Sequence, residues 1–250
     1  MSVFDLSGKT AIVTGAARGL GQGIAVALAE AGADVVCVSY NSSENTMSSI
    51  RSLGRSTSGI EVDLSDRDKL QGAFDQALEL TGHVDILVNN AGVIRRTPAK
   101  DHSMQDFLDV IDLNLNSAFF LSQIAGRHMI ERGSGKIINI CSMLSYQGGI
   151  NVPGYTASKH GIAGITKALA NEWASSGIQV NGIAPGYIET DNTEQIRNDP
   201  DRLRSITDRI PAGRWGTPKD IGAPAVFLAS AAADYVNGHV LCVDGGWMAR

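Results

Sequence analysis

The sequence has few cysteines, and none of them is placed as a metal site or a disulfide framework would require. Cys37, Cys141 and Cys242 are far apart, odd in number and set in apolar runs. None belongs to a C-x-x-C pair, so we expect reduced, buried thiols. The five histidines also lack HxxxH, HExxH or Cys/His spacing. We therefore predict no metal site.

Long apolar runs and basic clusters are absent too. No uninterrupted apolar run approaches the ~18 residues that a membrane helix needs. The N-terminus, Met-Ser-Val-Phe-Asp-Leu-Ser-Gly-Lys, has no charged-then-apolar leader. The formal net charge is -5, which argues against nucleic acid as a partner. We expect a cytoplasmic protein that binds neither membrane nor nucleic acid.

Glycine is abundant. The 250 residues include 28 glycines, and 43% of the chain is hydrophobic, enough for a sizeable core. Glycine in such numbers suits the tight turns and close backbone approaches of nucleotide-binding folds.

Short β-rich runs alternate with helical patterns along the chain. Strands are predicted at 9–14, 34–40, 57–62, 84–89, 135–141, 178–184 and 240–243, and helices near 43–53, 65–80, 104–132, 155–175 and 218–229. This alternation predicts an α/β fold, with one doubly wound domain over residues 1–250 and about seven parallel strands covered by helices on both faces. Ligands are then expected at the carboxyl ends of the strands. Residues 186–214 interrupt this alternation of strands and helices. We expect them to form a substrate-binding insertion and call them the substrate segment.

A glycine motif follows the first strand and opens a helix. Gly15, Gly19 and Gly21 have the spacing G-x-x-x-G-x-G, and Leu20 begins the apolar face of the helix. Glycines let the backbone approach a pyrophosphate at a helix N-terminus, where free N–H groups favour an anion.

The end of the second strand bears on the choice of cofactor. A carboxylate there would bind a ribose 2′-hydroxyl and repel a 2′-phosphate. Ser39, Tyr40 and Asn41 occupy this place, and Arg18 of the glycine loop could pair with a 2′-phosphate. The residues favour NADP, but polar side chains also bind the diol of NAD, so both cofactors remain open.

Two asparagine-containing segments allow more than one interpretation. Asn89-Asn90-Ala91-Gly92 ends the fourth strand and is either a plain turn or a polar floor under a cofactor. Asn114 lies inside the predicted helix 104–132, where asparagine is unfavourable. It would kink that helix, hold a water or face solvent.

Tyr155 and Lys159 are four residues apart and share one face of a predicted helix. A fixed ammonium favours the phenolate form of a neighbouring phenol. Ser142 adds a hydroxyl at the end of the fifth strand. Together these groups could take a proton from an alcohol or return one to a ketone, whereas the pair alone would be commoner as a surface feature.

With these residues in place, the chain resembles the classical short-chain dehydrogenase/reductase family from end to end. The matches occur in family order: Thr14-Gly15-x-x-x-Gly19-x-Gly21, Asn89-Asn-Ala-Gly92, Asn114, Ser142 with Tyr155-x-x-x-Lys159, and Pro185-Gly186 with Thr190. The resemblance implies a Rossmann-type domain, a homotetramer and a catalytic tetrad of Asn114, Ser142, Tyr155 and Lys159.

The resemblance also implies how the cofactor is bound. Asp63, followed by Leu64, would contact the adenine ring, Asn90 the ribose region, and Ile188 and Thr190 the nicotinamide amide. The full expected set is Gly15, Arg18, Gly19, Leu20, Gly21, Ser39, Tyr40, Asp63, Leu64, Asn90, Ala91, Gly92, Tyr155, Lys159, Pro185, Gly186, Ile188 and Thr190.

Within the family the likeness is greatest to dehydrogenases of sugar acids. The expected reaction is hydride transfer between NAD or NADP and a secondary alcohol or ketone of a sugar acid. The expected substrate contacts are Arg95, Arg96, Ser142, Gln147, Asn151, Tyr155 and Tyr187, with the arginines suited to a carboxylate. Alternatives are a gluconate 5-dehydrogenase, a 3-oxoacyl-carrier-protein reductase and, in another class, a non-catalytic nucleotide-binding sensor.

Overall fold

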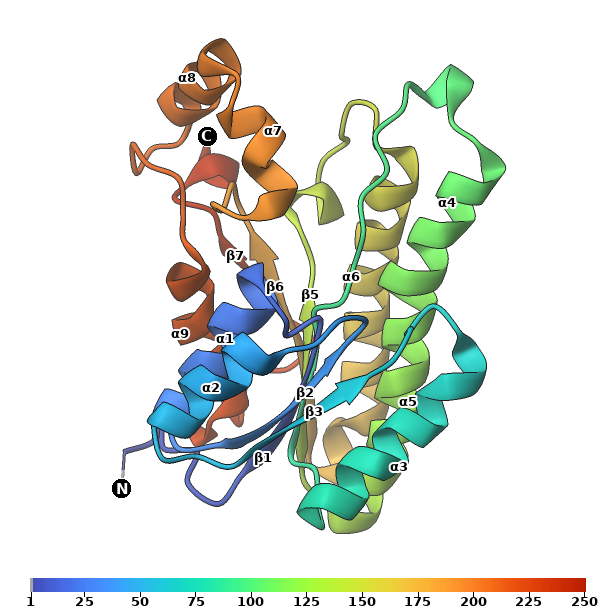
Figure 1. The fold of residues 1–250 in the computed structure, drawn as a ribbon, viewed down its shortest axis with the longest axis vertical. Coiled ribbons are helices and arrows are strands. Elements are labelled where there is room, and N and C mark those ends of the chain that lie inside the picture. Colours follow the sequence, from blue (N-terminus) through green and yellow to red (C-terminus); the bar gives the residue numbers. More distant parts are fainter. Residues whose placement is uncertain (1) are drawn as a thin grey trace.

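Seven parallel strands form the centre of the computed structural model, which describes residues 2–250 apart from the side chain of Asn192. The strands are β1 (Thr10–Thr14), β2 (Asp34–Ser39), β3 (Thr57–Glu61), β4 (Ile86–Asn89), β5 (Gly135–Ile140), β6 (Ile178–Pro185) and β7 (Val240–Val243). Their order in the sheet is β3-β2-β1-β4-β5-β6-β7 (Figure 1). The direction of winding reverses between β1 and β4, and ligands of such sheets bind at this switch point. The predicted doubly wound fold is confirmed.

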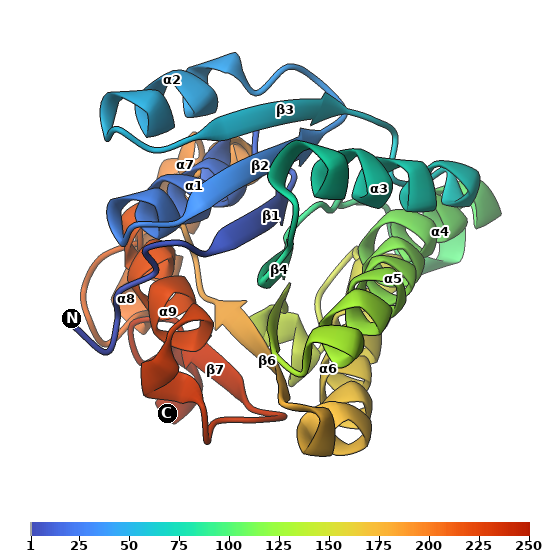
Figure 2. The same cartoon turned by 90° about the horizontal axis from the view of Figure 1, so that it is seen from below.

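Helices cover both faces of the sheet (Figure 2). One face carries α1 (Gly19–Glu30), α2 (Glu44–Ser52) and α9 (Pro218–Ala229), and the other carries α3 (Leu70–Thr81), α4 (Met104–Ile111), α5 (Ser117–Arg132) and α6 (Pro153–Trp173). The substrate segment contains α7 (Glu194–Arg197) and α8 (Pro200–Arg209), which lie beyond the carboxyl ends of the strands (Figure 1).

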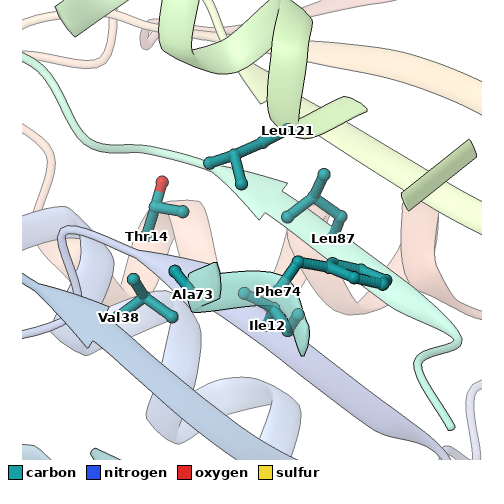
Figure 3. A pocket seen from close by; sticks show the side chains of 7 residues that line it. All are labelled: Ile12, Thr14, Val38, Ala73, Phe74, Leu87 and Leu121. Carbon is teal, nitrogen blue, oxygen red and sulfur yellow. The ribbon is translucent and has the colours of Figure 1, made fainter. Parts of the chain in front are cut away.

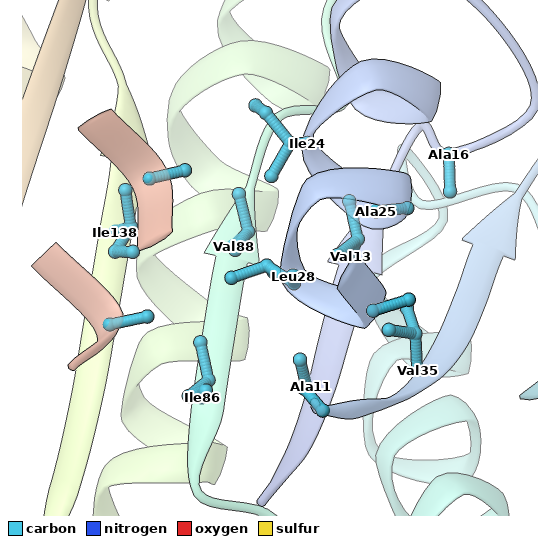
Figure 4. Packing of buried hydrophobic residues seen from close by; sticks show 14 of the residues in the cluster. Ala11, Val13, Ala16, Ile24, Ala25, Leu28, Val35, Ile86, Val88 and Ile138 are labelled. Carbon is cyan, nitrogen blue, oxygen red and sulfur yellow. The ribbon is translucent and has the colours of Figure 1, made fainter. Parts of the chain in front are cut away.

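Successive side chains of a strand point to opposite faces of the sheet, and each face has its own hydrophobic cluster. Val13 of β1 packs with Ile24 and Leu28 of α1, while Ile12 packs with the cluster of α3 and α5 on the other face. Figure 4 shows the first of these clusters between α1 and the strands. Because both faces of the central strands are buried, β1, β2 and β4 are mostly apolar rather than alternating, whereas the edge strand β3 is largely polar.

The start of α3 differs from the prediction. A helix was expected over 65–80, but the Asp63 carboxylate accepts hydrogen bonds from Ser65 N (2.9 Å) and Ser65 Oγ (2.7 Å). A 3₁₀ turn, Arg67–Lys69, follows, and α3 begins at Leu70. Aspartate favours this local turn because its carboxylate binds nearby backbone N–H groups.

The helix predicted over 104–132 is continuous but irregular. A π-helical turn, Asp112–Asn116, joins α4 to α5, and Ser117 N donates to Asp112 O. Such turns insert one residue into a helix and are frequent at functional sites. The expected distortion at Asn114 is therefore present.

The prediction that all three cysteines are buried is wrong for Cys242. Cys37 and Cys141 are buried, and burial raises the pKa of each thiol to about 11. Cys242 is exposed because it lies on β7, the last strand of the sheet. Within residues 2–250, no helix combines the length and apolar character that a membrane span requires.

A small cavity of about 10 Å³ lies between the sheet and α3 (Figure 3). Its lining is apolar except for Thr14: Ile12, Thr14, Val38, Ala73, Phe74, Leu87 and Leu121. This volume barely reaches that of one water molecule. The cavity is a packing void and offers no room for a substrate.

Close packing of α1 against α9 gives a test of the fold. A Cβ on Gly222 would lie 2.6 Å from Ala27 Cβ, whereas a Cβ on Gly164 of α6 would meet nothing within 4 Å. Gly222→Ala should lower the free energy of unfolding by about 1–3 kcal/mol. Gly164→Ala, the matched control, should raise it by about 0.5–1 kcal/mol. Urea denaturation measures both, and equal effects would contradict this account of the helix crossing.

Candidate active site

The glycine loop connects β1 to α1 in a conformation that few other residues could adopt. Gly15 and Gly19 have positive φ angles of 65° and 57°. A Cβ on Gly21 would lie 2.1 Å from Gly15 O, so the loop folds tightly against the helix. No side chain caps the N-terminus of α1. Its backbone N–H groups are thus available to an anion, as the motif predicted.

The end of β4 is joined to the glycine loop by side-chain hydrogen bonds. Asn90 Nδ2 donates to Thr14 O (2.8 Å) and Gly15 O (3.2 Å). Thr14 Oγ1 in turn accepts from the backbone N–H groups of Asn90 and Ala91, both at 2.9 Å. The Asn-Asn-Ala-Gly segment is therefore more than a turn, because it fixes the loop to the neighbouring strand end.

Lys159 of α6 is buried at the carboxyl end of β5. Its side chain is only 5% exposed, and Nζ donates to Ile140 O at 2.6 Å. The same Nζ lies 5.5 Å from the centre of the Tyr155 ring. Among the described residues no carboxylate forms an ion pair with it. An ammonium has three donors, so Lys159 retains hydrogen-bonding capacity for a ligand.

Ser142 lies two residues after the end of β5 and begins a 3₁₀ turn, Met143–Ser145. Its Oγ accepts from Leu144 N at 3.1 Å. Ser145 completes the turn, since its Oγ accepts from Ser142 N (3.2 Å) and donates to Lys159 O (2.6 Å). One buried hydroxyl thus connects the backbone of Ser142 to that of Lys159.

Asn114 is buried at the π-helical turn, and its amide is clamped to a neighbouring peptide group. Oδ1 accepts from Val93 N at 2.8 Å, and Nδ2 donates to Val93 O at 2.9 Å and to Ser158 Oγ at 3.3 Å. Of the three alternatives for Asn114, the surface position is wrong, because only 3% of the residue is exposed. The amide fixes the segment after β4 against α6.

The end of β2 carries no carboxylate, as the sequence showed. Ser39 Oγ is buried and accepts from Ala17 N and Ser43 Oγ, both at 3.1 Å. Its bond to Ala17 N holds the glycine loop against the end of β2. Tyr40, the next residue, is 72% exposed. Arg18 pairs with Asp191 of the substrate segment at 3.0 Å, and both side chains are largely exposed.

The other predicted cofactor residues lie around the same strand ends. Leu64 is buried in the core, and the Asp63 carboxylate holds the turn before α3. Gly186 packs against β7, where a Cβ would lie 2.6 Å from Asp244 Cα. A Cβ on Gly19 would lie 3.7 Å from Thr190 Cγ2, which places Thr190 across from the glycine loop.

The predicted substrate contacts differ in what they already bind. Arg95 lies 3.4 Å from Asp106 and 3.6 Å from Asp109, so two carboxylates offset its charge. Asn151 has a positive φ of 65°, and its O accepts from Thr97 N at 2.9 Å. Gln147 N donates to Met143 O. Arg96 is also engaged within the protein.

Tyr187 belongs to an aromatic cluster that the sequence analysis missed. Its ring lies 5.1 Å from that of Trp215 and 4.9 Å from that of Trp247 (centre to centre). Met143, next to Ser142, packs in the same cluster. Ser145 and Ser158 were missed as well. No spacing rule singles them out, because their distant partners, Lys159 O for Ser145 and Asn114 for Ser158, become neighbours only in the folded chain.

The fold and the site define a class of protein. An uncapped helix N-terminus after a glycine loop fits a pyrophosphate, and a buried ammonium with spare donors fits ribose hydroxyls. A phenol lies four residues before that ammonium in the chain, and a serine hydroxyl lies at the end of the strand whose last carbonyl the ammonium binds. These features are those of an oxidoreductase that uses a nicotinamide dinucleotide.

Sequence comparison assigns the family. The profile of the family described as enoyl-(acyl carrier protein) reductase matches residues 15–248. The chain belongs to the short-chain dehydrogenase/reductase family, as the resemblance implied, and it is an NAD(P)-dependent oxidoreductase.

Individual relatives cover nearly the whole chain. The 2-dehydro-3-deoxy-D-gluconate 5-dehydrogenase of Bacillus subtilis (strain 168) is 57% identical over 99% of this chain and 97% of its own. A candidate 2-deoxy-D-gluconate 3-dehydrogenase from Agrobacterium tumefaciens, crystallised with NADP, is 52% identical over 100% of both chains, with a TM-score of 0.94. A gluconate 5-dehydrogenase from Burkholderia cenocepacia J2315, in complex with NADP and tartrate, is 39% identical over 99% and 98%, with a TM-score of 0.94.

The bridging hydroxyl of Ser145 gives a test of the site. Ser145→Ala removes the bonds to Ser142 N and Lys159 O, so both groups should become less well positioned. We expect turnover to fall about tenfold, corresponding to ~1.4 kcal/mol of lost transition-state stabilisation. The control is Ser230→Ala, which removes an equally buried hydroxyl that donates to Phe227 O at the end of α9. If both variants kept wild-type turnover, the bridge would have no role in positioning.

Proposed function

We propose that the protein transfers a hydride between a nicotinamide cofactor and a secondary alcohol or ketone of a sugar acid. The substrate we favour is 2-dehydro-3-deoxy-D-gluconate or 2-deoxy-D-gluconate. The names of the Bacillus and Agrobacterium relatives support this choice. In the structure, the supporting observation is the buried Lys159 ammonium between the carboxyl end of β5 and the Tyr155 ring.

Side chains of the protein would transfer the proton. In the oxidative direction, Tyr155 takes the proton of the substrate hydroxyl, and Ser142 donates a hydrogen bond to the substrate oxygen. Lys159 holds ribose hydroxyls and places its positive charge 5.5 Å from the centre of the Tyr155 ring. Nicotinamide, when bound, accepts or supplies the hydride. General acid–base groups of this kind contribute about 10²–10⁴-fold to a rate.

Asn114 would keep this arrangement in place. Its clamp on Val93 and its bond to Ser158 join the segment after β4 to α6, which carries Tyr155 and Lys159. We propose that a water at the π-helical turn passes the proton onward. The irregular hydrogen bonding of that turn supports such a site.

A second candidate function is reduction of the 3-oxo group of a carrier-bound acyl chain. The matching family profile, described as an enoyl-(acyl carrier protein) reductase, supports the acyl chain, while its named reaction is on a C=C bond rather than on a ketone. A panel assay separates the two functions. With NAD and NADP as cofactors, kcat/KM is measured for 2-deoxy-D-gluconate, D-gluconate and a 3-oxoacyl thioester. Preference for the thioester would remove the sugar-acid assignment.

We also propose that residues 1–250 form one cofactor-binding domain with 186–214 as a substrate-binding insertion, and that four copies assemble in the cytoplasm. The single sheet supports the first statement. The apolar edge strand β7 supports an assembly through that edge, and three free cysteines suit a reducing compartment.

Tyr155→Phe tests the proton-transfer role. Removal of the phenolic hydroxyl should lower kcat about 10²–10⁴-fold and leave cofactor binding nearly unchanged. The control, Tyr146→Phe, removes a hydroxyl that donates to Val240 O at 2.8 Å. It should keep kcat within a few-fold of the wild-type value. Near-normal turnover of Tyr155→Phe would disprove the assignment.

Arg18→Ala tests the choice of cofactor. Its guanidinium is 75% exposed, so its ion pair with a 2′-phosphate should be modest, ~1 kcal/mol or about fivefold in affinity. The KM for NADP should rise by that factor, while the KM for NAD should not change. An equal change for both cofactors would show that Arg18 does not contact the 2′-phosphate.

A further inference from the structure

Arg197 lies at the end of α7 with its charge unmatched. The residue is partly buried, and Nη2 donates to Thr190 O at 3.1 Å. Its Nε is shielded from solvent and has no hydrogen-bond partner. Among the described residues, no aspartate or glutamate lies within ion-pair distance of it. A guanidinium has five N–H donors, so most of them have no partner in the protein.

Three other arginines around the site are neutralised by aspartates. Arg18 pairs with Asp191, Arg95 lies near Asp106 and Asp109, and Arg214 pairs with Asp220 at 2.8 Å. Arg197 differs from them in being partly buried without a carboxylate. Leaving a guanidinium in that state is costly unless an anion arrives to pair with it.

The location of Arg197 is next to the proposed chemistry. Thr190, which holds its Nη2, faces Gly19 of the glycine loop. The preceding residue, Ile196, packs in the aromatic cluster with Tyr187 and with Met143, the neighbour of Ser142. Figure 1 shows α7 beyond the carboxyl ends of the strands, close to the segment that follows β5. Arg197 therefore belongs to a stretch that contacts the glycine loop through Thr190 and packs with Met143 through Ile196.

We propose that Arg197 binds the carboxylate of the substrate, a hydroxy or keto acid. This inference deepens the proposed function and rests on it. The guanidinium is a planar fork that matches two carboxylate oxygens, and its bond to Thr190 O holds that fork in place. Shielding from water strengthens the attraction, because solvent does not screen it there. Arg197 thus selects an acid over a neutral polyol of the same carbon chain.

A matched pair of substrates tests the proposal. 2-Deoxy-D-gluconate and 2-deoxy-D-glucitol differ at C1, where a carboxylate replaces a hydroxymethyl group. In Arg197→Met, kcat/KM for the acid should fall about 10–100-fold, the range for a lost charge-assisted hydrogen bond. The value for the polyol should change less than about threefold. Arg204→Met, in the exposed part of α8, should alter neither.

Two results would overturn the proposal. If Arg197→Met left the ratio of acid to polyol unchanged because neither substrate was affected, the guanidinium would not bind the carboxylate. If both substrates lost activity equally, Arg197 would act only by holding Thr190. Arg197→Lys covers the case of a poorly folded Met variant: it keeps the charge but loses the fork, so the ratio should fall partway.

A binding measurement separates this proposal from the proposed function. Tartrate, titrated against the enzyme with NADPH while cofactor fluorescence is followed, requires no turnover. Arg197→Ala should weaken tartrate about 10–100-fold, and added guanidinium ion should restore part of the affinity. If the wild-type enzyme oxidised no sugar acid, the proposed function would fail, yet the tartrate titration would still decide whether Arg197 binds a carboxylate. Unaltered tartrate affinity would exclude it.

Discussion

The burial of one ammonium governs the arrangement of the site. In the part of the chain that the structure describes, Lys159 Nζ donates to one acceptor, Ile140 O, and has an aromatic ring centre at 5.5 Å. A buried charge with so little compensation costs several kcal/mol, which only a surrounding structure of high stability tolerates. β5 supplies the acceptor, and α6 brings Lys159 and Tyr155 together on one turn. The cation stays available to a polar ligand because the protein satisfies it incompletely.

Hydrogen bonds from side-chain amides and hydroxyls hold the strand ends and the adjoining loops in position. Asn90 with Thr14 joins β4 to the glycine loop, Asn114 holds Val93 against α6, and Ser145 joins the turn after β5 to Lys159. Each of these groups is wholly or largely buried and bonds to backbone atoms. In a low-dielectric interior such bonds are strong when satisfied and costly when broken. Substitutions at these positions should therefore affect geometry before they affect chemistry.

The fold followed from the sequence because its signals are local and repeated. Buried parallel strands read as apolar runs, and the glycine motif stands at a strand end where its meaning is specific. The site followed only in part. Asn114 was recognised, but its clamp on Val93 was not, because that contact spans 21 residues and depends on the π-helical turn. Cys242 was wrongly predicted to be buried, because an apolar sequence run looks the same in an edge strand and in a central strand.

The substrate side of the site depended most on tertiary structure. Arg95 and Arg96 stood out in the sequence because they follow a strand end, yet Arg95 is offset by two aspartates on α4. Arg197 has no such signal, since it sits in a four-residue helix within an irregular segment. A sequence shows which side chains are charged. Whether a charged side chain has an ion-pair partner is known only from the folded structure. In this protein the glycine loop and the residues around Lys159 are tied to strand ends, whereas Arg197 lies in a segment anchored through Tyr187, Ile196 and Thr190.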